Sequence, residues 1–248
     1  MRNIPILWKR EMASFFFSPI AFIVMAGFLL INGYFFWQIL NIFNGQPNIP
    51  PDISPMQIIF GGSFVFWVLM LIIPPVLTMR LFAEEKKSGT IEVLLTAPVT
   101  DAEVVWAKYL GAFAFYILMW APTLLYVLVL GHYGSIEMGP VFAGYIGVIL
   151  LGALFLSIGL FTSSLTSNQL ISAILCFVIL LFLFLTVFME NQVMSPKVRD
   201  FLAYINFLDH LQDLNRGILN TKPIIFYVTF TVFNLFLTTR VLETRRWR

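Results

Sequence analysis

Charged residues are scarce in this sequence. Only 11% of its 248 residues are Asp, Glu, Lys or Arg, whereas 59% are hydrophobic. Soluble domains average about 25% charged residues, so this chain has too little polar surface to fold in water. We therefore expect lipid to surround most of it. The small net charge of +2 argues against a nucleic-acid partner.

Cysteine and histidine are almost absent. Cys176 is the only cysteine, which excludes an internal disulfide, and its long apolar run indicates a packing residue. Of the two histidines, His210 lies between Asp209 and Asp213. A structural zinc site usually needs four ligands and a catalytic one three, so we favour a solvated helix face here and predict no metal site.

Two further absences bear on how the protein could obtain energy for transport. The phosphate-binding motif G-x-x-x-x-G-K-[ST] does not occur, so the chain cannot hold ATP in that manner. The centres of its apolar runs also lack Asp, Glu, Lys, Arg and His, which ion-coupled carriers usually keep inside the membrane. The sequence therefore predicts neither an enzyme nor a self-powered carrier, and no cofactor bound by this chain. Energy for active work would have to come from another chain.

Long charge-free runs are the main positive feature. A membrane-spanning helix needs about 20 apolar residues, and the runs predict one all-α integral membrane domain over 1–248 with six transmembrane helices. The first five spans fall within 20–189, at about 20–42, 57–79, 106–130, 139–162 and 169–189, and the sixth at 223–242. The polar cluster from Thr162 to Gln169 divides the fourth span from the fifth.

Residues 1–18 precede the first span. They combine Lys9 and Arg10 with Trp8 and several phenylalanines, which is typical of an amphipathic helix lying in the membrane interface. Pro19 separates this segment from the span. The alternative is the frayed start of span one.

A conspicuous polar interruption, the loop 81–104, separates spans two and three. A helix continuing from span two would carry Glu84 and Glu85, and Gly89 suits its left-handed C-terminus. Thr90 can cap a new short helix that Pro98 ends.

In that short helix, Ile91, Leu94 and Leu95 are spaced to form one apolar face, with Glu92 beside it. A capping box from Thr100 to Glu103 starts the next helix. A short amphipathic helix held between two spans favours a docking element for a soluble partner. An ordinary solvated loop with capped helix ends is the alternative.

The run EEKKSGTIEVLLTAPV, residues 84–99, resembles the loop between spans two and three in permeases of the ABC-2 type, with the gliding-motility branch nearest. The stretch DLNRGI at 213–218 and the terminal LETRRW at 242–247 strengthen a resemblance that covers most of the chain. It implies that the loop couples the permease to an ATPase through Glu84, Glu85, Gly89, Thr90, Ile91, Glu92, Leu94, Leu95 and Pro98.

The same resemblance implies a division of labour. A separate cytoplasmic ABC ATPase would bind ATP and Mg²⁺, while this chain would be the permease subunit for export, paired with a second copy or a paralogous permease. The gliding branch adds an accessory membrane protein with an extracytoplasmic domain. The alternative function is a non-transporting subunit that passes ATPase-driven motion to extracytoplasmic partners. The expected location is the bacterial cytoplasmic (inner) membrane.

Two sets of apolar residues are further candidates. In ABC-2 relatives spans two and five face the pathway between subunits, which makes Phe60, Phe64, Trp67, Phe177 and Phe184 candidates for lining it. Aromatic residues in a membrane span more commonly pack against other helices or contact lipid.

The loop 190–222 carries Phe201, Ile205, Leu208 and Leu211 near helical spacing. This predicts short extracytoplasmic helices before span six, similar to the paired re-entrant helices of ABC-2 permeases. The alternative is a surface helix without a transport role.

Basic residues predict the orientation, because cytoplasmic loops carry the excess of Lys and Arg. With six spans both termini share a side, and only Lys197, Arg199, Arg216 and Lys222 fall on the opposite one. Both termini and the loop 81–104 should therefore be cytoplasmic.

Single cysteines test this orientation in a Cys176→Ser background. Lys87→Cys and Arg246→Cys should react with an impermeant thiol reagent only from the cytoplasm, and Asp52→Cys only from outside, because an odd number of spans separates Asp52 from the other two. Labelling of Asp52→Cys and Lys87→Cys from one side would contradict the six-span topology.

Overall fold

The computed structural model describes residues 4–45, 57–90, 99–133, 137–189, 204, 206–215, 217 and 221–245. Within these residues the chain is helical and has no strand. Six helices in the described ranges are long and apolar enough to cross a membrane: Pro19–Phe43, Phe64–Ser88, Asp101–His132, Met138–Leu165, Gln169–Val187 and Thr221–Thr244. The predicted class is confirmed, and the chain is a multi-pass membrane protein.

The N-terminal segment is a helix of its own. α1 (Ile4–Phe16) and α2 (Pro19–Gly45) are joined by a turn, and Pro19 occupies the first helical position, where a missing N–H costs nothing. α1 packs along α7 (Asp101–Trp120), where Phe15 stacks on Phe115 with ring centroids 5.1 Å apart. Its predicted place in the membrane interface stays a prediction.

Span two starts with a break rather than the continuous helix expected from residue 57. The π-helical turn η1 (Ile58–Gly62) contains Gly61 at φ +120°, a conformation that L side chains rarely adopt. Trp67 Nε1 donates to the Gly61 carbonyl at 2.9 Å, which stabilises the break. α4 (Phe64–Thr78) begins after it, and α5 (Ala83–Ser88) continues the span.

Span three is interrupted near its far end. α7 is followed by the 3₁₀ turn η2 (Ala121–Thr123) and by α8 (Leu124–Tyr133). Pro122 lies in this turn and lacks the N–H that an α-helix needs. The predicted capping box at the start of α7 is confirmed, with Thr100 and Glu103 bonded reciprocally at 3.3 and 3.2 Å.

The predicted division between spans four and five is confirmed, because it falls within the polar cluster. α9 (Met138–Leu165) extends three residues beyond the predicted end of span four, and Thr166–Asn168 separate it from α10 (Gln169–Met189). The hydroxyls of Thr162 and Ser164 donate to carbonyls one turn back, at 2.9 and 2.7 Å, so these polar residues stay helical and buried.

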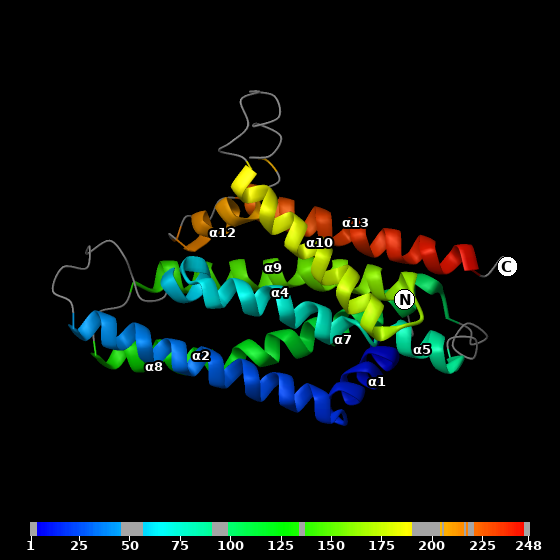
Figure 1. The fold of residues 1–248 in the computed structure, drawn as a ribbon, viewed down its shortest axis with the longest axis horizontal. Helices are drawn as coiled ribbons and strands as arrows, with labels where there is room; N and C mark the ends of the chain where they lie inside the picture. Colours follow the sequence, from blue (N-terminus) through cyan, green and yellow to red (C-terminus); the bar gives the residue numbers. More distant parts are fainter. Residues whose placement is uncertain are drawn as a thin grey trace.

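α9 is the central helix of the bundle and packs against α4, α7, α10, α12 (Phe207–Asn215) and α13 (Thr221–Arg245). Glycines permit this close packing, and a Cβ on Gly152 would lie 2.2 Å from the Tyr116 ring. α1, α5 and the C-terminal end of α13 lie at one end of the bundle, whereas η1 and α12 lie at the other (Figure 1). The predicted packing role of Cys176 is confirmed by its 1% exposure.

We predict that Gly152→Ala destabilises the protein, because overpacking costs roughly 1–3 kcal/mol and outweighs a helix-propensity gain of about 1 kcal/mol. Gly27→Ala is the matched control, since nothing lies within 4 Å of the Cβ it would add. Thermal unfolding in one detergent compares them. A thermal midpoint of Gly152→Ala equal to or higher than that of Gly27→Ala would contradict the close packing of Gly152 against Tyr116.

Candidate functional site

The polar stretch after span two forms the short helix α5, with Glu84 and Glu85 in its first turn. Gly89 has φ +72° and ends the helix in the left-handed conformation, as predicted. Thr90 Oγ1 lies 2.8 Å from Ser88 Oγ and donates back to the Glu85 carbonyl at 3.4 Å. The rest of the predicted short helix, with Ile91, Glu92, Leu94, Leu95 and Pro98, lies outside the described residues.

Hydrogen bonds fasten α5 to the end of α9. Ser163 Oγ accepts from the backbone N–H groups of Phe82 and Ala83 at 3.1 and 3.2 Å and donates to the Met79 carbonyl at 3.1 Å. Lys86 Nζ donates to the Ser164 carbonyl. Sequence reasoning placed Ser163 in a turn between spans, and no local pattern shows that its hydroxyl serves the backbone of another helix.

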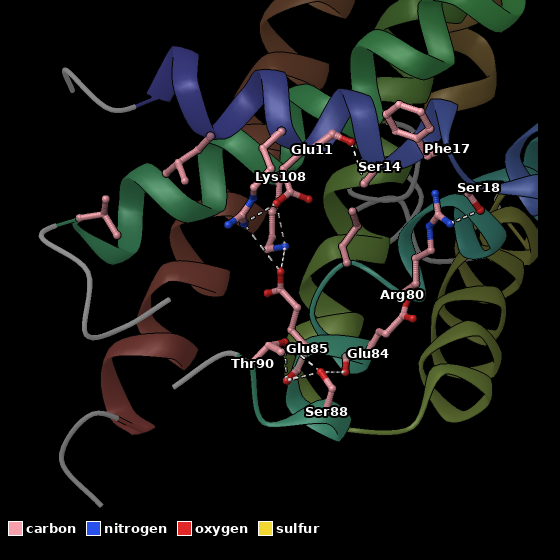
Figure 2. Close-up of a pocket in the computed structure, with 14 residues that line it drawn as sticks. Glu11, Ser14, Phe17, Ser18, Arg80, Glu84, Glu85, Ser88, Thr90 and Lys108 are labelled. Atoms are coloured by element: carbon pink, nitrogen blue, oxygen red, sulfur yellow. Dashed lines mark hydrogen bonds and ion pairs between the residues drawn. The ribbon is translucent and has the colours of Figure 1, made fainter. Parts of the chain in front are cut away.

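A cluster of four charged side chains joins α1, α5 and α7 (Figure 2). We call Arg10, Glu11, Glu85 and Lys108 the charged junction. Lys108 Nζ of α7 lies 2.6 Å from Glu85 Oε1 and 3.3 Å from Glu11 Oε1. Arg10 Nη2 pairs with the same Glu11 oxygen at 2.9 Å.

One side of the charged junction is buried, and the other side is exposed to solvent. The side chains of Lys108 and Glu11 are 2% and 8% exposed, whereas that of Arg10 is 54% exposed. A buried ion pair gains little over an apolar pair, but losing one partner leaves an uncompensated charge. The charged junction therefore holds three helices in one arrangement. Sequence reasoning missed it because residues 11, 85 and 108 share no local pattern.

The charged junction lines one side of a cavity of about 870 Å³. Arg80 and Ser18 line the opposite side, where an Arg80 nitrogen donates to the Ser18 hydroxyl (Figure 2). Thr90 and Val99, which flank the predicted docking helix, also line it. The cavity thus lies at the base of that segment.

Residues 11–242 match the family model described as ABC-2 family transporter protein. The chain belongs to this family. With its six apolar helices, it is the membrane-spanning permease component of an ABC transport system, and the family implies a cytoplasmic ABC ATPase as partner. A comparison with curated protein sequences gives no match.

The opposite end of the permease is held by α12. Asn215 Nδ2 donates to the Phe60 carbonyl in the break of span two, and Tyr227 of α13 donates to the Phe207 carbonyl at 2.7 Å. Leu211 is buried and Leu208 half-buried, and their place in an extracytoplasmic helix stays a prediction. Phe201 and Ile205 lie outside the described residues.

His210 also lies at this end of the bundle, where it is buried and not on the solvated helix face that the sequence predicted. Its ring lies 4.8 Å from that of Phe226, and burial lowers the pKa of His210 below its usual value. Within the described ranges, no three His, Cys, Asp or Glu side chains gather at one point.

The candidate pathway residues point in different directions. Phe60 and Trp67 are buried inside the bundle, whereas Phe64 and Phe177 are 78% and 37% exposed. Trp67 and Phe184 are in contact, with ring centroids 5.6 Å apart. Their lining of a transport pathway stays a prediction.

We predict that Lys108→Met lowers the free energy of unfolding by about 3 kcal/mol, because Glu11 and Glu85 then lose their buried cation and keep only the exposed Arg10 as a counter-charge. Lys9→Met on the exposed side of α1 is the control and should have little effect. Neutralising the carboxylates as well, with Glu11→Gln and Glu85→Gln, should restore most of the loss. Reversible denaturation in detergent micelles measures the change, and equal stability of Lys108→Met and the control would contradict it.

Proposed function

We propose that this permease exports a substrate with energy from a separate cytoplasmic ATPase, and that the segment from Thr90 to Pro98 docks with that ATPase. The observation that carries the proposal is that both flanks of the segment are fixed to membrane helices. Gly89 and α5 hold the first flank, and the Thr100 capping box on α7 holds the second. Force applied to the segment therefore reaches two spans directly.

The contacts of α5 distribute this force further. The charged junction connects α5 to α1 and α7, and Ser163 connects the chain just before α5 to α9. A displacement of the docking segment would thus move α1, α5, α7 and the end of α9 together. At the other end, α12 rests on α9 and α13 and bonds to the break in span two, and these contacts support our proposal that it acts as the outer gate.

The remaining parts of the proposal follow from the resemblance and the charge distribution. ATP and Mg²⁺ belong to the partner ATPase, and both termini and the docking segment face the cytoplasm of a bacterial cell. The permease works with a second copy or a paralogous permease. The resemblance to the gliding-motility branch adds an accessory protein with an extracytoplasmic domain to the proposal.

Substitutions in the docking segment test the proposal. Leu94→Asp places a carboxylate where the partner groove should be dry, and Gly89→Val strains a left-handed position. Glu92→Lys reverses a charge beside the apolar face. Central apolar anchors contribute about 2 kcal/mol or more to an interface, so Leu94→Asp should weaken ATPase association more than tenfold.

Copurification of the ATPase with each variant measures association, with Lys222→Glu at the start of α13, on the predicted outer side, as the control that should leave it unchanged. Retention of the partner at the wild-type ratio and full activity in both Leu94→Asp and Gly89→Val would show an ordinary loop. ATP-driven flux into sealed vesicles separates export from the purely mechanical alternative, which predicts ATP hydrolysis without flux.

A further inference from the structure

Span two is interrupted by a turn over residues 79–82, which separates α4 from α5. In a continuous α-helix each N–H group donates to the carbonyl four residues earlier. The N–H groups of Phe82 and Ala83 donate instead to Ser163 Oγ of α9, at 3.1 and 3.2 Å. The same hydroxyl donates at 3.1 Å to the Met79 carbonyl, which would be the helical acceptor for Ala83. One side chain of span four thus takes the place of two backbone hydrogen bonds of span two.

The backbone groups that Ser163 satisfies have alternative partners within span two. Met79 already has helical backbone angles. Phe82 has a helical ψ of −36°, but its φ of −115° is about 50° from that of an α-helix. Closing the helix therefore requires a rotation of that size at Phe82, which joins the two N–H groups to the carbonyls one helical turn back. A buried N–H group without a partner is costly, so removal of the Ser163 hydroxyl favours the continuous helix.

α4 is held against α9 one helical turn before Ser163. A Cβ on Gly159 would lie 2.1 Å from Thr78 Oγ1, so the two helices approach closely where α4 ends. Gly159 and Ser163 are four residues apart and therefore lie on one face of α9. The glycine fixes where α4 ends, and the serine fixes the direction in which the chain continues to α5.

We propose that Ser163 is a positioning residue for ATPase coupling, because it keeps span two interrupted and thereby sets the direction of α5. This inference rests on the proposed docking role of the segment from Thr90 to Pro98. That segment begins directly after α5 and Gly89, whereas its other flank is capped on α7 at Thr100. Closure of the span-two helix rotates the first flank and leaves the second in place. The segment then loses the orientation in which it passes force to the spans.

Spin-label distances in the purified permease, without ATPase or nucleotide, test the role of the Ser163 hydroxyl in the fold. Labels at Lys87→Cys on α5 and Thr244→Cys on α13 are introduced in a Cys176→Ser background. Lys87 lies about 7 Å along the helix from the rotated bond, so closure in Ser163→Ala should shift the peak distance by about 5 Å. The thermal midpoint of each variant shows that it is folded.

Ser164→Ala is the matched control, because its hydroxyl donates to the Phe161 carbonyl of its own helix at 2.7 Å, and it should keep the wild-type distance. Ser163→Thr retains the hydroxyl and should keep that distance too. The proposal is overturned if Ser163→Ala gives the same distance as Ser164→Ala, or if Ser163→Thr shifts as far as Ser163→Ala. Failure of Ser163→Ala to fold would show that the backbone groups have no alternative partners, which overturns it as well.

The assembled transporter tests the coupling role. Ser163→Ala should retain the ATPase at the wild-type ratio, because no residue of the docking segment changes. It should hydrolyse ATP about tenfold more slowly per bound ATPase, which corresponds to about 1.4 kcal/mol. Wild-type hydrolysis by Ser163→Ala would overturn the positioning role. The docking function fails separately, through retention of the ATPase by Leu94→Asp, and the distances in the permease alone do not depend on it.

Discussion

The pairing of Lys108 with two carboxylates is the interaction on which the α1–α5–α7 end of this permease depends. A lysine that is 2% exposed next to the apolar part of a span is tolerated only with close counter-charges. Glu11 and Glu85 supply them from α1 and α5, helices that are far apart in the sequence. The need to neutralise one ammonium group therefore fixes where the N-terminal helix and the end of span two lie.

Uncharged polar side chains also join the helices at both ends of the bundle. Ser163 satisfies two backbone N–H groups where the chain turns between α4 and α5, at a place where water has little access. Asn215 has the same role for the Phe60 carbonyl at the opposite end, where the span-two helix is broken. Both ends of the bundle are thus held by polar contacts between helices, while close packing around α9 holds the middle.

Features with local causes were predictable from the sequence. The six spans follow from apolar runs, the left-handed Gly89 from a helix end, and the capping box from Thr100 and Glu103 three residues apart. Features that depend on distant residues were not. Ser163 bonds to the backbone of Phe82 and Ala83, Asn215 bonds to the Phe60 carbonyl, and the charged junction joins residues 11, 85 and 108.

Distances between spin labels in the assembled transporter test most directly whether α1 and α5 move as one body. In a Cys176→Ser background, labels at Lys9→Cys on α1 and Lys87→Cys on α5 report on the charged junction, and a pair at Lys87→Cys and Thr244→Cys reports motion relative to α13. A rigid junction predicts that the Lys9–Lys87 distance distribution is the same without nucleotide and in the vanadate-trapped state, while the Lys87–Thr244 distribution shifts. A nucleotide-dependent change between Lys9 and Lys87 as large as that of the second pair would contradict it.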